Sequence, residues 1–191
     1  MSGIDKDWVS AYFEYGVDVN NRRVFLDDDI EDCSISPLVK GLYLMETLDS
    51  TKPIELFISS FGGSVYEALA LYDILNTLKC PVHTFGYGKI MSSAVLLLAA
   101  GTAGNRWITR HTSLLTHAWS AEIDGKSFDI KNRYQHFQKI EADWTDLLVK
   151  HTTKTKHFWD KLAAKNCDAY FTADQAIEWG VVDAIWEEKS R

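Results

Sequence analysis

A repeated pattern of strand, glycine-rich turn and helix limits the folds that this chain of 191 residues can adopt. Each copy begins with a short apolar segment, continues through glycines and ends in a helix with apolar spacing. The copies are a strand at Ile54 to Ile58 followed by a helix from Ser64, and a strand at Pro81 to Phe85 followed by Gly86 to Gly88 and a helix from Ser92 to Ala100. Strands joined through helices run parallel with right-handed crossovers, so the pattern predicts an α/β fold of repeated β-α-β units.

Other elements follow from hydrophobic spacing and capping residues. We expect further strands at Arg23 to Leu26, Arg106 to Thr109, Ser113 to His117 and Val181 to Trp186. Ser36-Pro37 should open one helix, and Ser64 with Glu67 should cap the next. A long helix should run from about Ser127 to His151, and a last one should begin at a cap of Thr172 with Gln175 and end at Gly180. The helix after Ser127 carries aromatic and apolar residues on one side, which indicates that this side is covered.

Composition excludes several classes of partner. The hydrophobic content of 46% is enough for one core, and the net charge of -7 leaves no basic stripe for nucleic acid. No signal peptide or membrane-spanning run is found, so we expect no membrane contact and a cytoplasmic location. Three widely spaced cysteines indicate neither a disulfide framework nor a metal site.

Two segments could supply a serine hydrolase with its nucleophile and its oxyanion donors. Ser92 follows a glycine-rich strand end and opens an apolar helix, where free N–H groups favour negative charge, although a simple N-cap serine would look the same. Gly62 and Gly63 end a strand, and their backbone amides could approach a substrate closely. A plain strand-to-helix turn explains the two glycines nearly as well.

A general base and a residue to orient it are also available. His117 ends an apolar strand, where its ring could be held facing a cleft, while a structural histidine is the alternative. Asp168 precedes the Tyr170-Phe171 pair and could fix the tautomer of a histidine, or could be a solvated loop residue. Each signal is weak alone, and their combination favours a serine hydrolase.

Several blocks of the sequence resemble those of the ClpP-type serine peptidases, in the family's order and at matching intervals. The resemblance extends from roughly Arg22 to Trp186. The blocks are Ser59 to Ser64, Gly88 to Ala94, Leu97 to Gly101, Thr112 to His117, and Cys167 to Ala173 followed by Ala176, Glu178, Gly180 and Val182-Asp183.

The resemblance implies roles for particular residues. Ser92 would be the nucleophile, His117 the general base and Asp168 its partner. The backbone amides of Gly63 and Ser93 would form the oxyanion hole, with Gly62 in the turn beside the substrate strand. No metal or organic cofactor is expected.

The resemblance also implies an architecture and partners. We expect the ClpP/crotonase-like fold with a protruding long "handle" helix, an N-terminal arm at 1–21 and a peptidase domain at 22–191 whose handle region covers about 120–165. The subunit would form a homo-oligomer, a heptameric ring or double ring, that hydrolyses peptides and unfolded polypeptides in its chamber. An AAA+ unfoldase is a candidate partner.

Some positions differ from the family pattern, and other functions remain open. Phe61 replaces a proline, Ser93-Ala94 replaces Met-Gly, and Ala118-Trp119 replaces Gln-Pro. The alternatives are a crotonase-like acyl-CoA enzyme, a non-catalytic subunit or scaffold, and a phage-type capsid maturation peptidase with a serine-lysine pair. Lys89 is the lysine nearest to Ser92 for such a pair, although His117 is the better base.

Overall fold

A twisted, mainly parallel sheet forms the centre of the computed structural model, which describes residues 12–120, 123–164 and 167–186. The strand order is β1-β2-β3-β4-β5-β8, and β6 pairs with both β4 and β7. β1 and β7 are antiparallel to their neighbours, and the other pairings are parallel. The strands are β1 Val17–Asp18, β2 Arg23–Leu26, β3 Ile54–Ser60, β4 Val82–Met91, β5 Arg106–Ile108, β6 Ser113–Thr116, β7 Ala169–Phe171 and β8 Ala184–Ile185.

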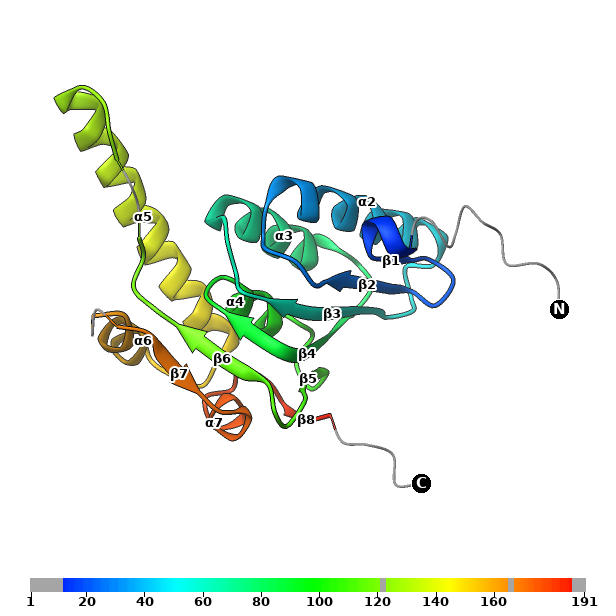
Figure 1. The fold of residues 1–191 in the computed structure, drawn as a ribbon. Helices are drawn as coiled ribbons and strands as arrows, with labels where there is room; N and C mark the ends of the chain where they lie inside the picture. Colours follow the sequence, from blue (N-terminus) through cyan, green and yellow to red (C-terminus); the bar gives the residue numbers. More distant parts are fainter. Residues whose placement is uncertain (1–11, 121–122, 165–166, 187–191) are drawn as a thin grey trace, which may run out of the picture.

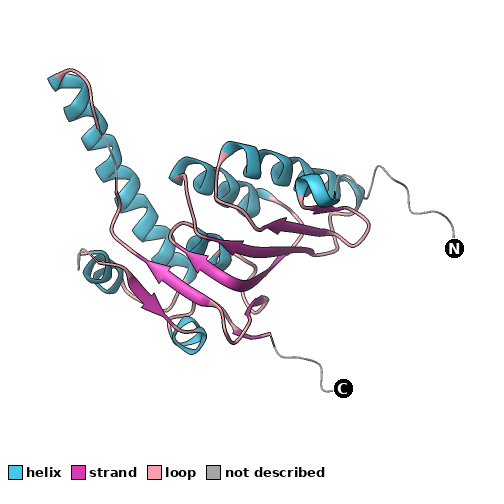
Figure 2. Ribbon diagram, viewed as in Figure 1, coloured by secondary structure: helices cyan, strands magenta, loops and turns pink. Residues whose placement is uncertain are grey.

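Helices connect these strands and cover the sheet (Figure 1). They are α2 Asp32–Leu48, α3 Val65–Thr77, α4 Ala94–Ala99, α5 Ser127–His151, α6 Lys156–Ala163 and α7 Ala173–Glu178. α2 and α3 lie side by side along β2 and β3, whereas α5 extends far beyond the sheet (Figures 1 and 2). The expected repeated β-α-β units and protruding helix are confirmed. The proposed boundary between an arm and a domain stays a prediction, and residues 1–11 lie outside the described part.

The sheet and α2 to α4 enclose the core. All six residues of α4 are buried, so this short helix lies inside the molecule and begins directly behind Ser92. The largest fully buried side chains are Leu26, Ile30, Ile35, Leu38, Leu42, Met45, Ile54, Leu56, Ile58, Leu71, Ile90 and Leu96. The site described below is therefore built on rigid, well-packed backbone.

β4 differs from the sequence-based expectation in a way that positions the site. The predicted break at Gly86 to Gly88 is wrong, because the strand continues to Met91. A shift in its register against β3 and a left-handed Gly88 (φ 64°) allow it to bend. Its first half pairs with β5 and its second half with β6, so one strand serves two neighbours in turn.

Helix α2 begins earlier than expected. It starts at Asp32, and Pro37 lies inside it rather than at its first turn. The N–H of Glu31 donates to Ser34 Oγ at 3.0 Å, which satisfies a backbone donor at the helix start. The capping box of Thr172 with Gln175 is confirmed in both directions, whereas at Ser64 only half of the expected box forms in the described residues: its hydroxyl accepts from the N–H of Glu67.

A partly buried ion pair joins elements that are far apart in the second half of the chain. Arg106 on β5 forms two hydrogen bonds with the carboxylate of Asp183, at 2.6 and 3.0 Å. Its guanidinium also donates to the carbonyls of Ala99, at the end of α4, and His151, at the end of α5. Burial would raise the pKa of Asp183, but the hydrogen bonds and charge of Arg106 outweigh this, and the pKa is lowered.

We expect Asp183→Asn to lower the free energy of unfolding by about 3 kcal/mol, because it leaves Arg106 buried without its counter-charge. Glu55→Gln is the matched control: Glu55 is buried to a similar extent as Asp183, but its partner Arg23 is 45% exposed, so this pair should contribute less than about 1 kcal/mol. The folded-state pKa of Asp183 is depressed, so its stabilisation is complete above the pKa of an unfolded aspartate and is lost as pH falls through the folded value. Thermal melts at neutral and acidic pH measure both effects; equal losses in the two variants would contradict the expectation.

Candidate active site

Ser92 lies at the end of β4 in a conformation that is unusual for its residue type. Its φ is 53°, in the left-handed region that costs energy for a residue with a side chain. The backbone N–H of Ser92 donates to the carbonyl of Leu115 on β6 at 2.8 Å. This bond links the serine turn to the strand that leads directly to His117.

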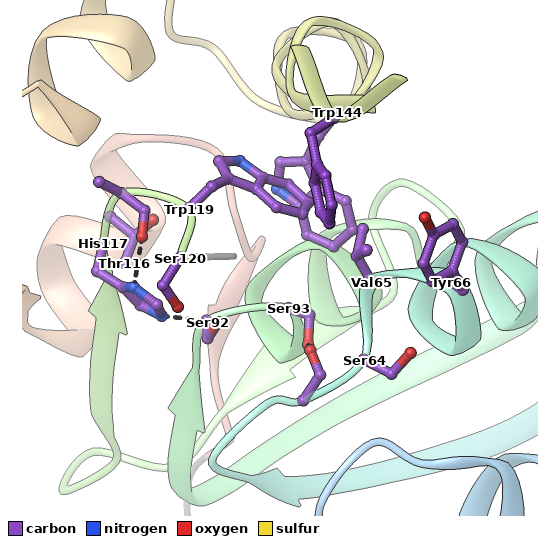
Figure 3. Close-up of a pocket in the computed structure, with 13 residues that line it drawn as sticks. Ser64, Val65, Tyr66, Ser92, Ser93, Thr116, His117, Trp119, Ser120 and Trp144 are labelled. Atoms are coloured by element: carbon purple, nitrogen blue, oxygen red, sulfur yellow. Dashed lines mark hydrogen bonds between the residues drawn. The ribbon is translucent and has the colours of Figure 1, made fainter. Parts of the chain in front are cut away.

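Ser92 and His117 are brought together, as their predicted roles require. The Oγ of Ser92 is 2.9 Å from Nε2 of His117 (Figure 3). On the other side of the ring, Nδ1 is 2.7 Å from the carbonyl oxygen of Ala118. A carbonyl can only accept a hydrogen bond, so Nδ1 carries the proton and Nε2 presents its lone pair to the serine hydroxyl.

Asp168 occupies a neighbouring position without bonding to the imidazole. Thr116 pairs with Ala169 in the antiparallel ladder of β6 and β7, so Asp168 and His117 are the next residues on the two strands. The Asp168 side chain is exposed, and in the described part of the chain no hydrogen bond joins it to His117. The Nδ1–H group donates instead to the carbonyl of Ala118, a backbone group that no sequence motif marks.

The two glycines pack directly against the serine turn. A Cβ on Gly62 (φ 95°) would lie 2.7 Å from Met91 O and 2.7 Å from the Cβ of Ser92. Gly63 (φ 148°) forms a parallel bridge with Ile30, and a Cβ there would meet the Ile30 carbonyl at 2.4 Å. Glycine is therefore required at both positions for close approach of two backbones.

Two residues that line the cavity beside Ser92 have backbone N–H groups without an acceptor in the described part of the chain. Gly63 and Ser93 both line it, and within residues 12–120, 123–164 and 167–186 neither N–H donates a hydrogen bond. Ser93 is the N-cap of α4, where N–H groups lack partners inside the helix. Unpaired amides next to a serine and an imidazole can stabilise an oxyanion.

The cavity has a volume of about 320 Å³ and a largely apolar outer wall. Val65, Tyr66, Trp119, Phe137 and Trp144 form this wall, and the described lining includes no Lys, Arg, Asp or Glu side chain. Figure 3 shows the tryptophan indoles on the side of the cavity away from the His117 ring. Such a wall suits apolar side chains of a bound ligand.

Lys89 has a different environment from the one a serine-lysine pair needs. Its ammonium lies over the ring of Phe61, 4.7 Å from the centroid. In the described residues the Ser92 hydroxyl bonds to His117, and no hydrogen bond connects it to Lys89. No group of three or more His, Cys, Asp or Glu residues that could hold a metal ion is found in the described part.

Comparison with known proteins identifies the family. A family model described as Clp protease matches residues 8–189. The chain belongs to the Clp protease family. It is 32% identical to ATP-dependent Clp protease proteolytic subunit 2 of Corynebacterium efficiens, over 87% of this chain and 83% of that protein. Subunit 2 of Rhodococcus jostii is also 32% identical, over 87% of this chain and 85% of that protein. Subunit 1 of Corynebacterium jeikeium is 32% identical, over 87% of this chain and 88% of that protein.

Membership in the Clp protease family makes the chain a serine-type peptidase of the ClpP type. The Clp-type fold accounts for the elements around the cavity, with β4, β6 and the Gly62-Gly63 turn converging on it. No helix in the described part is long and apolar enough to cross a membrane.

We expect Gly62→Ala to lower peptide hydrolysis by this Clp-type chain at least 100-fold, because the new Cβ forces the serine turn to move. Gly104→Ala is the matched control: its φ of 83° imposes similar strain, about 1 kcal/mol, but nothing lies within 4 Å of its Cβ. Steady-state kinetics and thermal melts of both variants separate contact from strain. Equal activity in the two variants would show that contact with the serine turn is unimportant.

Proposed function

We propose that this chain is a serine endopeptidase that hydrolyses peptides and unfolded polypeptides through Ser92 and His117. The observation that carries the proposal is the 2.9 Å contact between Ser92 Oγ and His117 Nε2, with the Nδ1 proton directed to the Ala118 carbonyl. This arrangement leaves Nε2 free to accept the serine proton. It is the geometry that a serine nucleophile and its general base require.

The mechanism consists of acylation and hydrolysis. Ser92 Oγ attacks the substrate carbonyl while its proton passes to His117 Nε2, and the N–H groups of Gly63 and Ser93 stabilise the oxyanion. The imidazolium then donates its proton to the leaving amine, and the acyl-enzyme forms. Water then attacks the ester while its proton passes to His117, and His117 returns this proton to Ser92 Oγ as the ester bond breaks and the acid product leaves. Gly62 keeps the turn beside the substrate strand free of side-chain atoms.

Asp168 is proposed as an auxiliary electrostatic group. Its place in the β6–β7 register, next to His117, supports a favourable interaction between its carboxylate and the imidazolium that forms during catalysis. The Asp168 carboxylate is exposed to water, which screens that interaction. The proposal therefore gives Asp168 a smaller part than Ser92 and His117.

We propose that the peptidase works as a homo-oligomer, a heptameric ring or double ring, in the cytoplasm. The relatives are named proteolytic subunits of ATP-dependent proteases, and these names support a subunit role and an AAA+ unfoldase as partner. Exposed apolar side chains on the outer part of α5, Phe128 (81% exposed) and Tyr134 (55%), support contact with another subunit.

We expect Ser92→Ala to abolish peptide hydrolysis and labelling by a fluorophosphonate, with the oligomeric state unchanged. His117→Ala should lower kcat by roughly 10⁴-fold, because the serine loses its base. Ser93→Ala should keep kcat within about tenfold of the wild-type value, because Ser93 is proposed to act through its backbone N–H. Lys89→Ala should do the same, because the Lys89 ammonium lies over Phe61. Mass spectrometry with peptide mapping identifies the labelled residue.

Three outcomes of that experiment would refute the proposal. A label on Ser93 would show that Ser93, not Ser92, is the nucleophile. A loss in Lys89→Ala as large as that in His117→Ala would favour a serine-lysine mechanism of the capsid maturation type. Absence of any label in the assembled wild-type protein would favour a non-catalytic subunit.

We expect Asp168→Asn to lower kcat only about tenfold, far less than His117→Ala, because an exposed carboxylate is well screened and Ala118 already fixes the tautomer. The measurement is kcat for a fluorogenic peptide at low and high ionic strength, with Asp174→Asn, another exposed aspartate, as control. A loss comparable with that of His117→Ala would make Asp168 a full member of a triad.

A further inference from the structure

The loop that follows His117 carries the group that orients the imidazole. The Ala118 carbonyl accepts the Nδ1 proton at 2.7 Å, so the position of this carbonyl decides where Nε2 points. Ala118 cannot fix its own backbone, because its side chain is a single methyl group. A contact that holds this carbonyl in place would therefore come from the neighbouring residues of the loop.

Trp119 is the residue that attaches this loop to the rest of the molecule. Its indole packs on the core and meets Trp144 of α5 edge to face, with ring centroids 5.3 Å apart and planes at 85°. Trp144 is itself buried, with 7% of its surface exposed. In Figure 3 the Trp119 indole reaches from the loop toward Trp144.

Cavities lie on both sides of this contact. Ala118 and Trp119 line the cavity of about 320 Å³ beside Ser92, and they also line a second cavity of about 550 Å³ between α5 and α6. Their segment thus lies between two open spaces, and the described contact that joins it to α5 is the edge-to-face packing of Trp119 on Trp144. A single aromatic contact in such a place has a large effect on backbone position.

We propose that Trp119, held by Trp144, is a positioning residue that places the Ala118 carbonyl and so aligns His117 with Ser92. Replacing Trp119 by a small residue opens the two cavities into each other and releases the carbonyl. The imidazole then loses its fixed tautomer and orientation, and Ser92 loses its base. The inference rests on the proposed role of Ser92 and His117.

Trp119 also lines the substrate cavity, so the test must separate positioning from substrate binding. Diisopropyl fluorophosphate reports on positioning, because it is small and needs only an activated serine: Ser92 Oγ attacks phosphorus, fluoride leaves, and the proton passes to His117. Its rate of reaction with Ser92 is compared with kcat and KM for a peptide substrate.

For Trp119→Ala we expect the phosphorylation rate and kcat to fall together, on the order of 10- to 100-fold. Trp144→Ala should have a similar effect, and the double variant should be little worse than either single variant, because both remove the same contact. Trp119→Phe keeps an aromatic edge and should recover most of the rate. Thermal melts establish that each variant is folded, and Trp119→Phe and Trp144→Phe provide graded losses if an alanine variant does not fold.

Phe137→Ala is the matched control, because Phe137 lines the same cavity from α5 and has no hydrogen bond or ring contact to the loop in the described residues. It should raise KM and leave the phosphorylation rate unchanged. If Trp119→Ala behaves like Phe137→Ala, Trp119 is only a wall of the cavity and the inference is overturned. If the wild-type protein is not modified at Ser92, the proposed function itself fails, and the inference with it.

Discussion

The pairing of the second half of β4 with β6 is the constraint on which the site depends. Met91 is aligned with Leu115, and the next hydrogen bond in this direction is from the N–H of Ser92 to the Leu115 carbonyl. Two residues further along β6 the chain reaches His117. A shift of this register by one residue would turn the imidazole to the other side of the sheet, so the ladder fixes the Ser92–His117 distance more firmly than either side chain could.

The left-handed backbone of Ser92 and the two glycines beside it also determine the geometry of the site. Ser92 adopts a left-handed conformation because β4 must end abruptly and α4 must start at once inside the core. Gly62 and Gly63 allow the neighbouring strand end to lie against this turn without a side chain between them. The strain is borne by a helix whose residues are all buried and by a dense core, which is how active-site strain persists in folded proteins.

The sequence allowed much of this to be predicted, and the misses have physical reasons. α5 was predicted with its observed bounds, and the caps at Ser64 and Thr172 follow from local chemistry that tertiary structure does not override. The glycines of β4 suggested that the strand ends there, because a strand that bends where it changes its partner from β5 to β6 has the same glycine-rich composition as a turn. Helix α6 was missed: its cap at Thr155 lacks an acidic or amide residue three positions later. In the site, Ser92 and His117 meet as expected, whereas the Ala118 carbonyl could not be found from sequence, since every residue has one.

The order of the segments along the chain has a consequence for biosynthesis. Gly63 follows β3, Ser92 follows β4 and His117 follows β6, whereas Trp144, the last of the four along the chain, lies on α5; all four line one cavity. A ribosome that has not yet released α5 has therefore produced a chain with its serine and histidine but without the indole that packs behind the histidine loop. On the role proposed for Trp119, such a chain has a poorly aligned serine and histidine, and it reaches full activity only when α5 has packed behind the loop.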